Sequence, residues 1–397
     1  MKLEDFRVIS YSFKIILSPL DNQILITTII KISSLQNKLK TISFKLNPKV
    51  KIISIKEKEF CDLEYSFIQG KIKINLSKDL KLKKETSINI AYLIFNELQN
   101  FNTDKRDFWM RYDSVWYPIT EQIQFSSFKC LIHAPKKYYA ISHGKLVKII
   151  RKKESNIFFW EEKNLISRFC MIFGDFYKST KYKKNLEISF YYTSDQVKNN
   201  LNNYFDISEK IIEFFNKTFC KYPYKNLKII EITDEDKYSG YSDPSIIMIN
   251  NKRHDNNIIP FLAHEIAHQW WGNLIIFDEE QGNLLNECFA EISSFLYFKK
   301  YNLKSSANID KYFSLINLDN SHINNDNSVG NKNITQLKKY IYKLDRIMCA
   351  IGEYKFKNFL QSIIYENIYN VINTDEFVSN RLESTLGDVN ILSKLKD

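Results

Sequence analysis

Histidine, proline and glycine are all scarce in this 397-residue chain, which holds six, seven and nine of them respectively. So little proline and glycine leaves no Pro- or Gly-rich stretch that would mark a linker between domains. No run reaches the ~18 apolar residues that a transmembrane helix needs, so we expect no membrane partner. The N-terminus MKLEDFRVIS carries Glu4, Asp5 and Arg7 where a secretory signal has an unbroken apolar run.

Cysteine is equally sparse, and its spacing excludes several kinds of site. No two of the six cysteines form a Cys-x-x-Cys pair, which argues against a zinc ribbon or a redox dithiol. A disulfide framework is typical of small secreted domains, which this chain does not resemble in length. We therefore expect a reduced, soluble, cytoplasmic protein.

Lysine is abundant, and the net charge is +11. Basic charge gathered on one face can mark a nucleic-acid partner. Here the lysines are spread along the chain, with only short clusters such as KLKK (81–84) and KYKK (181–184). Short blocks of like charge usually face solvent. We therefore expect no nucleic-acid partner.

The pattern of hydrophobic residues changes near residue 180. Before it, stretches such as KIKINLS (71–77) and SINIAYLIF (87–95) alternate apolar and polar residues or are rich in β-branched ones, which predicts strands. After it, residues 195–219 show helical spacing of apolar side chains, and from residue 257 the chain is mostly helical. We predict an α+β protein with an N-terminal all-β domain at residues 1–180 and a second, mixed α/β domain at residues 181–397.

Two of the six histidines lie within five residues of each other, in AHEIAHQWWGN. Pro260 suits the first turn of a helix, and Gly272 suits the position just past its end. On such a helix His264 and His268 project from the same face, where two imidazoles can chelate a divalent metal such as zinc. Glu265 between them takes the general-base position of an H-E-x-x-H hydrolase.

A catalytic zinc usually has three protein ligands, so two histidines are not enough. The stretch LLNECFAEISSFLYF is predicted to be a second helix, and Glu287 near its start lies 19 positions after His268. A carboxylate there would complete a His, His, Glu set. Glu291, one turn further, is placed to accept the other N–H of a ligating histidine. On spacing alone, an ordinary surface carboxylate is an equally good interpretation of Glu291.

These residues resemble the aminopeptidase-N family of zinc metallopeptidases, which are gluzincins with a thermolysin-like catalytic domain. The family pattern is H-E-x-x-H-x-W-x-G-N followed by N-E-G-F-A, with eighteen residues between the second histidine and that glutamate. This chain departs from it only at Cys288, where glycine is usual. RYDSVWYPI (111–119) and KYPYKNLKIIEI (221–232) are similar to other family segments. The resemblance implies an N-terminal antiparallel β saddle or sandwich domain, then a thermolysin-like domain. The C-terminal helical domain of larger members is absent from this sequence, which implies a more open site.

The resemblance also implies a role for each residue of the motif. One zinc ion would be bound by His264, His268 and Glu287, with Glu291 in contact with a ligand. Glu265 would be the general base, which takes a proton from zinc-activated water and returns it to the leaving amine of a peptide substrate.

Two departures from the family pattern concern the substrate. Where the family has a G-A-M-E-N-like strand whose Glu binds the free amino group, this chain reads GYSDPSIIM. Gly240 and Asp243 are therefore candidate substrate-binding residues, although Asp243 is equally well interpreted as a turn residue before Pro244. The family has an oxyanion-stabilising tyrosine in a Y-x-K-G segment. When the sequence is aligned backward from Gly352, Leu337 takes the place of that tyrosine. Tyr340, three residues on, is the candidate donor in its place.

Two functions remain open at this point. The first is an active zinc aminopeptidase that releases N-terminal residues from peptides, favoured by the complete ligand set with its base. The second is a zinc-binding family member with weak or no catalysis that binds peptides or other partners. Leu337 favours the second, because losing one oxyanion donor typically costs ~10²–10³ in rate.

Overall fold

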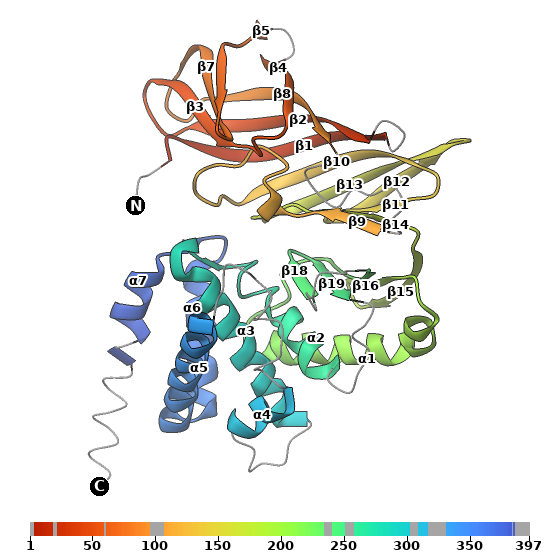
Figure 1. The fold of residues 1–397 in the computed structure, drawn as a ribbon. Coiled ribbons are helices and arrows are strands. Elements are labelled where there is room, and N and C mark those ends of the chain that lie inside the picture. Colours follow the sequence, from red (N-terminus) through yellow and green to blue (C-terminus); the bar gives the residue numbers. More distant parts are fainter. Residues whose placement is uncertain are drawn as a thin grey trace. The chain divides into compact units, whose positions relative to one another are not determined.

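The chain folds into two compact units, Met1–Phe176 and Tyr177–Asp397. The computed structural model describes residues 4–18, 22–58, 61–95, 107–233, 240–250, 258–301, 309–316, 331–382 and 384–385. The first unit is built mainly of strands, and the second combines strands with helices (Figure 1). This architecture confirms the predicted α+β class.

Within its described residues, the first unit has fourteen strands in three sheets. The strands are β1 (Phe6–Ser18), β2 (Gln23–Ser34), β3 (Leu39–Lys45), β4 (Lys51–Glu57), β5 (Cys61–Asp62), β6 (Tyr65–Ile68), β7 (Lys71–Leu80), β8 (Glu85–Phe95), β9 (Asp107–Met110), β10 (Ser126–Pro135), β11 (Tyr139–Ile141), β12 (Lys145–Arg151), β13 (Ser155–Ile166) and β14 (Met171–Gly174). The large sheet has the order β12-β13-β10-β1-β2-β8-β4-β5, and the two small sheets have the orders β11-β14-β9 and β3-β7-β6.

The large sheet is antiparallel, as predicted, except at one pair of strands. Strand β1 runs parallel to β10, in a register that pairs Ser10 with Ser127 and Ile16 with His133. Parallel neighbours need a long crossover connection, and here most of the unit lies between the two strands. Alternation within a strand does not reveal which distant strand will pair with it, so the sequence did not predict this pairing.

The core of the first unit comes from the inward-facing half of these alternating strands. In β1, Phe13 and Ile15 are buried, whereas Lys14 between them is exposed. Phe13 makes ring contacts with Trp116, Tyr117 and Phe128, at centroid separations of 5.3, 5.6 and 5.5 Å. Aromatic packing of this kind adds specific geometry to a large burial of apolar area.

The second unit is organised around a mixed five-stranded sheet of the order β15-β16-β17-β19-β18. Its members are β15 (Tyr177–Lys183), β16 (Leu186–Tyr192), β17 (Asn226–Ile232), β18 (Gly240–Asp243) and β19 (Ile246–Asn250). The three central strands are parallel, and the edge strands β15 and β18 are antiparallel to their neighbours. A second small sheet pairs β20 (Ile276–Phe277) with β21 (Val371–Ile372).

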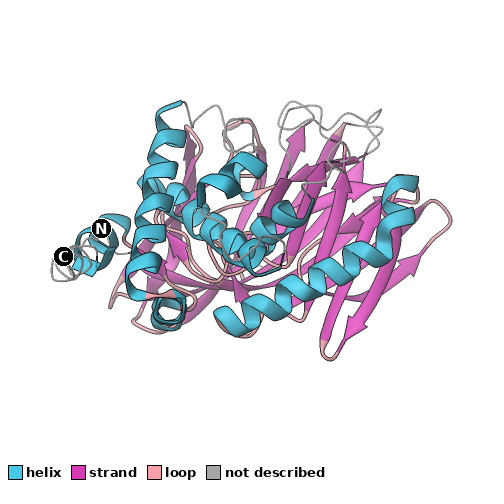
Figure 2. Ribbon diagram, turned by 90° about the horizontal axis from the view of Figure 1, so that it is seen from below, coloured by secondary structure: helices cyan, strands magenta, loops and turns pink. Residues whose placement is uncertain are grey.

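Helices of the second unit gather on one side of its five-stranded sheet (Figures 1 and 2). They are α1 (Asp195–Thr218), α2 (Ile258–Ala267), α3 (Glu279–Tyr301), α4 (Ile309–Ile316), α5 (Asn331–Ile351), α6 (Glu353–Asn367) and α7 (Thr374–Phe377), and α7 is followed by one π-helical turn at Val378–Leu382. Helix α2 packs against both α1 and α3, so it lies in the centre of the helical layer.

Helix α1 illustrates how local sequence produces these elements. Ser194 is its N-cap residue, and the Ser194 hydroxyl accepts a hydrogen bond from the amide of Val197 at 3.3 Å. The apolar face that the helical spacing predicts is largely buried, including Ile211 and Phe215. Ser208, a polar residue on the same face, is also fully buried.

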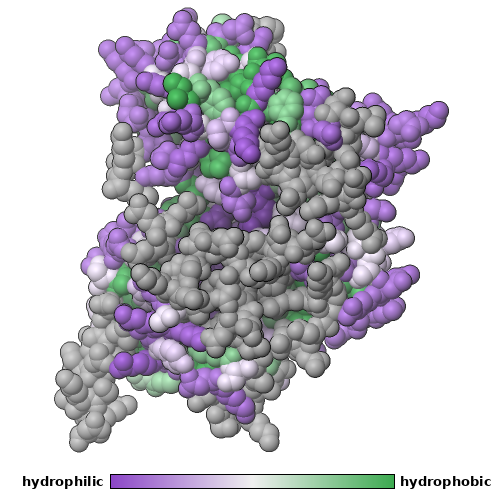
Figure 3. Space-filling view, viewed as in Figure 1, coloured by the Kyte–Doolittle hydropathy of each residue, from purple (hydrophilic) through white to green (hydrophobic). Residues whose placement is uncertain are grey.

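On the visible face of the first unit, hydrophilic residues surround a smaller group of apolar ones (Figure 3). Several exposed lysines form ion pairs, such as Lys31 with Glu85 at 2.6 Å and Lys45 with Glu121 at 3.0 Å. Exposed pairs of this kind contribute little to stability. Among the described residues, no helix is both long and apolar enough to cross a membrane.

Candidate metal centre

The histidine pair lies at the C-terminal end of α2. The sequence predicts a helix that ends just before Gly272, but α2 ends at Ala267. The amides of Gln269 and Trp270 each donate to the carbonyl three residues earlier, at 3.0 Å, which tightens the final turn. The amide of His268 still bonds to the carbonyl of His264 at 3.2 Å, so the two side chains remain one helical turn apart.

The Gly-Asn pair that ends the motif closes this turn. Gly272 has a φ of +92°, a left-handed conformation that glycine adopts without strain. A Cβ added to it would lie 3.4 Å from the side chain of Asn286, the residue before Glu287. The Asn273 side-chain amide donates to the carbonyl of His268 at 2.9 Å. This bond satisfies the carbonyl of His268 in the turn that follows α2.

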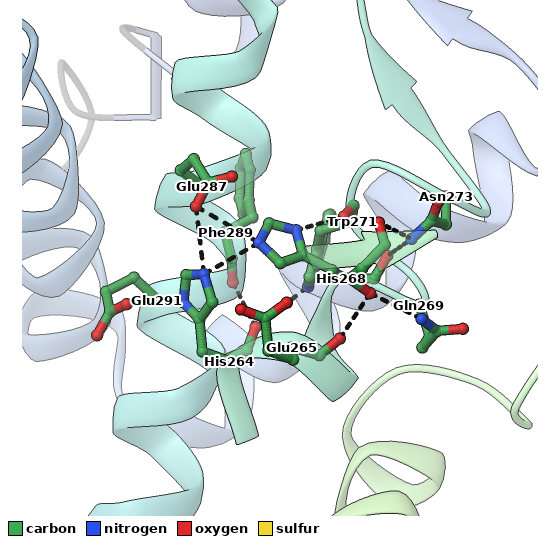
Figure 4. A network of polar contacts seen from close by, with 11 residues as sticks. His264, Glu265, His268, Gln269, Trp271, Asn273, Glu287, Phe289 and Glu291 are labelled. Atoms are coloured by element: carbon green, nitrogen blue, oxygen red, sulfur yellow. Dashed lines mark hydrogen bonds and ion pairs between the residues drawn. The ribbon is translucent and has the colours of Figure 1, made fainter. Parts of the chain in front are cut away.

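Three side chains converge at this helix end (Figure 4). The Nε2 atoms of His264 and His268 lie 3.0 Å apart. The Oε2 atom of Glu287, from α3, lies 3.2 Å from the first and 3.4 Å from the second. The structure thus brings together all three predicted ligands from two helices, with their ligand atoms within 4.8 Å of one another.

These distances suit a zinc ion. Tetrahedral zinc with ligands at 2.0–2.1 Å places neighbouring donor atoms about 3.3 Å apart. The other ring nitrogens face different partners: Nδ1 of His268 lies 3.0 Å from the carbonyl oxygen of Trp271, and Nδ1 of His264 lies 2.7 Å from Oε2 of Glu291, without the alignment of a hydrogen bond. With the proton on Nδ1 in each ring, both Nε2 lone pairs are free to face the shared space. The residues present therefore fit the metal.

The charges in this cluster favour a cation. Burial lowers the pKa of His264, but the Glu287 and Glu291 carboxylates outweigh it and raise that pKa well above its usual range. Burial likewise raises the pKa of Glu287, but the two histidines outweigh it and hold that pKa far below its usual range. Both shifts come from the same contact, in which each partner stabilises the charged form of the other.

Glu265 lies directly beside the edge strand β18. Its side chain is buried, and the hydroxyl of Ser242 donates to its backbone carbonyl at 2.9 Å. A Cβ built on Gly240 would lie 3.1 Å from Oε1 of Glu265 and 2.5 Å from the ring of Phe261. The structure therefore brings the predicted base and the predicted strand together, and glycine is the residue that fits between them.

Replacing Gly240 by alanine is expected to lower the free energy of unfolding by about 1–3 kcal/mol, because the added methyl overpacks the buried ring of Phe261. Urea denaturation of the parent and the variant measures the difference. Gly352→Ala isolates backbone strain for comparison, because a Cβ there meets nothing within 4 Å while its φ of +83° strains any L side chain. If Gly240→Ala were as stable as the parent, the ring of Phe261 could move away from the added methyl at no cost in free energy.

Gln269 is a positioning residue that the sequence analysis missed. It is fully buried, and its side-chain amide donates to the Ser242 hydroxyl at 2.8 Å and to the Asp243 carbonyl at 3.0 Å. Its oxygen accepts from the amide of Ser245 at 2.7 Å. These bonds attach the β18–β19 turn to the turn that follows α2. The one sequence signal for this role is that Gln269 directly follows the motif residue His268.

Asp243 lies at the start of the tight turn between β18 and β19. It pairs with Ile246 across the turn, and Ser245 within the turn has a φ of +62°. The Asp243 side chain is buried, with the residue 1% exposed. The backbone of Asp243 therefore agrees with the interpretation as a turn residue. Its binding of a substrate amino group stays a prediction.

Helix α5 packs against α3 beside Glu287. Leu337 is fully buried, and its carbonyl oxygen lies 3.7 Å from Sγ of Cys288. Burial, with the charges of Glu287 and Glu291, raises the pKa of the Cys288 thiol well above its usual range, so this thiol stays protonated. Tyr340 is half-buried on the same helix. Its role as an oxyanion donor stays a prediction.

A His-Glu-x-x-His helix with a carboxylate from the next helix is the arrangement typical of zinc-dependent hydrolases. Comparisons with known proteins agree: residues 203–395 match the Peptidase family M1 domain. Residues 203–395 therefore belong to this family, the aminopeptidase-N family of zinc metallopeptidases, as the motif predicted.

Relatives with curated descriptions match only part of the chain. Aminopeptidase N of Lactococcus lactis is 25% identical over 158 residues, which cover 36% of this chain and 19% of that protein. Human endoplasmic reticulum aminopeptidase 1 is 26% identical over 196 residues, 45% of this chain and 21% of that protein. Rat aminopeptidase N is 43% identical over 54 residues, 14% of this chain and 5% of that protein. The matches thus span about a fifth or less of these relatives.

Solved structures match the whole fold. The M1 zinc metallopeptidase of Deinococcus radiodurans has a TM-score of 0.74 at 11% identity, covering 97% of this chain and 93% of that chain. A mutant of that metallopeptidase bound to a Tyr-Ser-Ala substrate has a TM-score of 0.75 at 10% identity, covering 98% and 94%. At this identity the likeness establishes the two-domain fold alone.

Proposed function

We propose that this chain is a zinc-dependent aminopeptidase, which binds one zinc ion through His264, His268 and Glu287 and removes N-terminal residues from peptides. The observation that carries the proposal is the convergence of three donor atoms at mutual distances of 3.0, 3.2 and 3.4 Å. Family membership supports it, since the relatives with curated descriptions are named aminopeptidases.

Glu265 is the general base in this proposal. When bound, zinc supplies a Lewis acid that polarises the scissile carbonyl and activates water. The Glu265 carboxylate takes a proton from the attacking water and delivers it to the leaving nitrogen. Its burial, at 4% exposure of the residue, keeps bulk water from competing for that proton.

Strand β18 is the proposed substrate-binding element. As an edge strand of the five-stranded sheet, it presents main-chain groups that an extended peptide can pair with. Gly240 in this strand lies beside the base. We propose that Asp243 binds the free amino group, in place of the family's glutamate, and that Tyr340 is the donor to the oxyanion.

A zinc-binding protein with weak catalysis, which binds peptides or other partners, is the second candidate function. Leu337 favours it, because this buried side chain has no hydroxyl to donate beside α3. For either function we propose a cytoplasmic location, which the six free cysteines support, because thiols persist in a reducing compartment.

Fluorogenic aminoacyl amides test the aminopeptidase proposal. The zinc-loaded protein is expected to hydrolyse substrates with a free N-terminus, to lose activity with 1,10-phenanthroline and to regain it when zinc is restored. N-acetylated versions of the same substrates are the control, and they are expected to be poor substrates. Stoichiometric zinc with no turnover of any substrate supports the second candidate instead, and preferential cleavage of blocked peptides would make the protein an endopeptidase.

A further inference from the structure

The carboxylate of Glu291 is held by only one of its two oxygens. Its side chain is 6% exposed, and Oε2 lies 2.7 Å from Nδ1 of His264. That contact is short but poorly aligned for a hydrogen bond. Among the described residues, Oε1 of Glu291 is buried and has no hydrogen-bond partner. A buried carboxylate in this situation is costly, because burial removes the water that would otherwise solvate its charge.

A phenol lies near the same carboxylate. Tyr312, from α4, is 1% exposed, and its hydroxyl donates to Oγ of Ser294 at 2.8 Å. Ser294 follows Glu291 by three residues on α3, so both side chains are on the same face of that helix. The Ser294 hydroxyl donates its own proton to the carbonyl of Pro260 at 2.9 Å.

The electrostatics of Tyr312 agree with this placement. Burial raises the pKa of the Tyr312 phenol well above its usual range, and the nearby Glu291 carboxylate raises it further. A phenol bonds more strongly to a carboxylate than to a neutral hydroxyl, because the charge of the acceptor strengthens the bond. Rotation about the C–O bond would turn the phenol proton from Ser294 towards Glu291, and Ser294 would keep its bond to Pro260.

We propose that Tyr312 is a positioning residue of the metal centre, which donates its hydroxyl proton to Oε1 of Glu291 and so fixes the carboxylate that orients His264. This inference rests on the zinc site of the proposed function. It adds α4 to the elements that build that site. The support runs outward from the ligand His264 through Glu291 to Tyr312, each buried.

Zinc binding by the Tyr312→Phe variant tests the inference without any measurement of activity. Metal-free full-length protein is titrated with zinc in competition with a chromogenic chelator. Partners of metal-ligating histidines are typically worth 10–100-fold in metal affinity, and we expect the more distant hydroxyl to be worth about tenfold. Tyr297→Phe is the matched control. Tyr297 is a buried tyrosine of α3 that packs on Phe214 at a centroid separation of 5.5 Å, and its loss of a hydroxyl is expected to leave the zinc Kd unchanged.

A double-mutant cycle separates positioning from packing. If Tyr312 acts through Glu291, Tyr312→Phe changes the zinc Kd by less than twofold when introduced into the Glu291→Gln variant, whose acceptor is no longer charged. Fully additive effects on the Kd would mean that Tyr312 acts through packing, and they would overturn the inference.

The outcomes also distinguish this inference from the proposed function. A parent protein that binds zinc, with a Tyr312→Phe variant that binds it equally well, overturns the role of Tyr312 and leaves the metal centre intact. A parent protein that binds no zinc overturns both. Circular dichroism of the metal-free variant confirms that the Kd refers to folded protein.

Discussion

Replacing Glu265 by glutamine is expected to lower kcat/KM for peptide hydrolysis by about 10²–10⁴-fold, the usual contribution of a general base. Glutamine has nearly the same size and shape but cannot accept the proton of the attacking water. Glu265 is not one of the three converging ligands, so zinc is expected to stay bound. Steady-state kinetics with an aminoacyl substrate and metal analysis of the same sample measure both quantities.

Glu353→Gln is the control for this substitution. Glu353 is an exposed residue in the first turn of α6, where it pairs with Lys357 at 2.7 Å. The same change of charge there is expected to leave kcat/KM within twofold. If Glu265→Gln retained more than a tenth of the parent activity, another group would have to be the base.

Removing the Glu287 carboxylate, as in Glu287→Ala, is expected to weaken zinc binding by more than about 100-fold. This loss is larger than that caused by removing a residue that only contacts a ligand. The variant leaves two imidazoles, whose Nε2 atoms lie 3.0 Å apart, with no anionic ligand. Peptidase activity is expected to disappear with the metal. Chelator competition measures the affinity, and residual activity is assayed with and without added zinc.

Glu291→Gln provides the matched comparison on the same helix. The amide oxygen can still accept from Nδ1 of His264, so the expected loss of zinc affinity is about 10–100-fold and smaller than that of Glu287→Ala. The reverse order would mean that Glu291, not Glu287, is the ligand. Equal and negligible losses in both variants would contradict the site altogether.

The parts of the site that the sequence predicted are those that depend on one helix at a time. His264 and His268 share a face because residues four apart always do so on a helix, and the same rule relates Glu287 to Glu291. The contact of Glu291 with His264 at 2.7 Å follows once the two helices cross. The spacing between the two halves of the motif indicated the family. The resemblance to that family then implied that the two helices cross at the metal site.

The parts that the sequence did not predict depend on pairing between distant segments. No local pattern indicates that Gly240 approaches Glu265, that Gln269 holds the β18–β19 turn or that Tyr312 reaches the surroundings of Glu291. The end of α2 at Ala267 was also missed, because the left-handed Gly272 closes the turn after the helix and is not the first residue past it.

Anomalous diffraction at the zinc absorption edge, from crystals of protein purified without chelator, is the most direct test of the metal centre. We predict a single strong peak bounded by Nε2 of His264, Nε2 of His268 and the Glu287 carboxylate, at about 2.0–2.2 Å from each. A map with no peak between these atoms, or with the three side chains turned away from one another, would contradict a zinc peptidase.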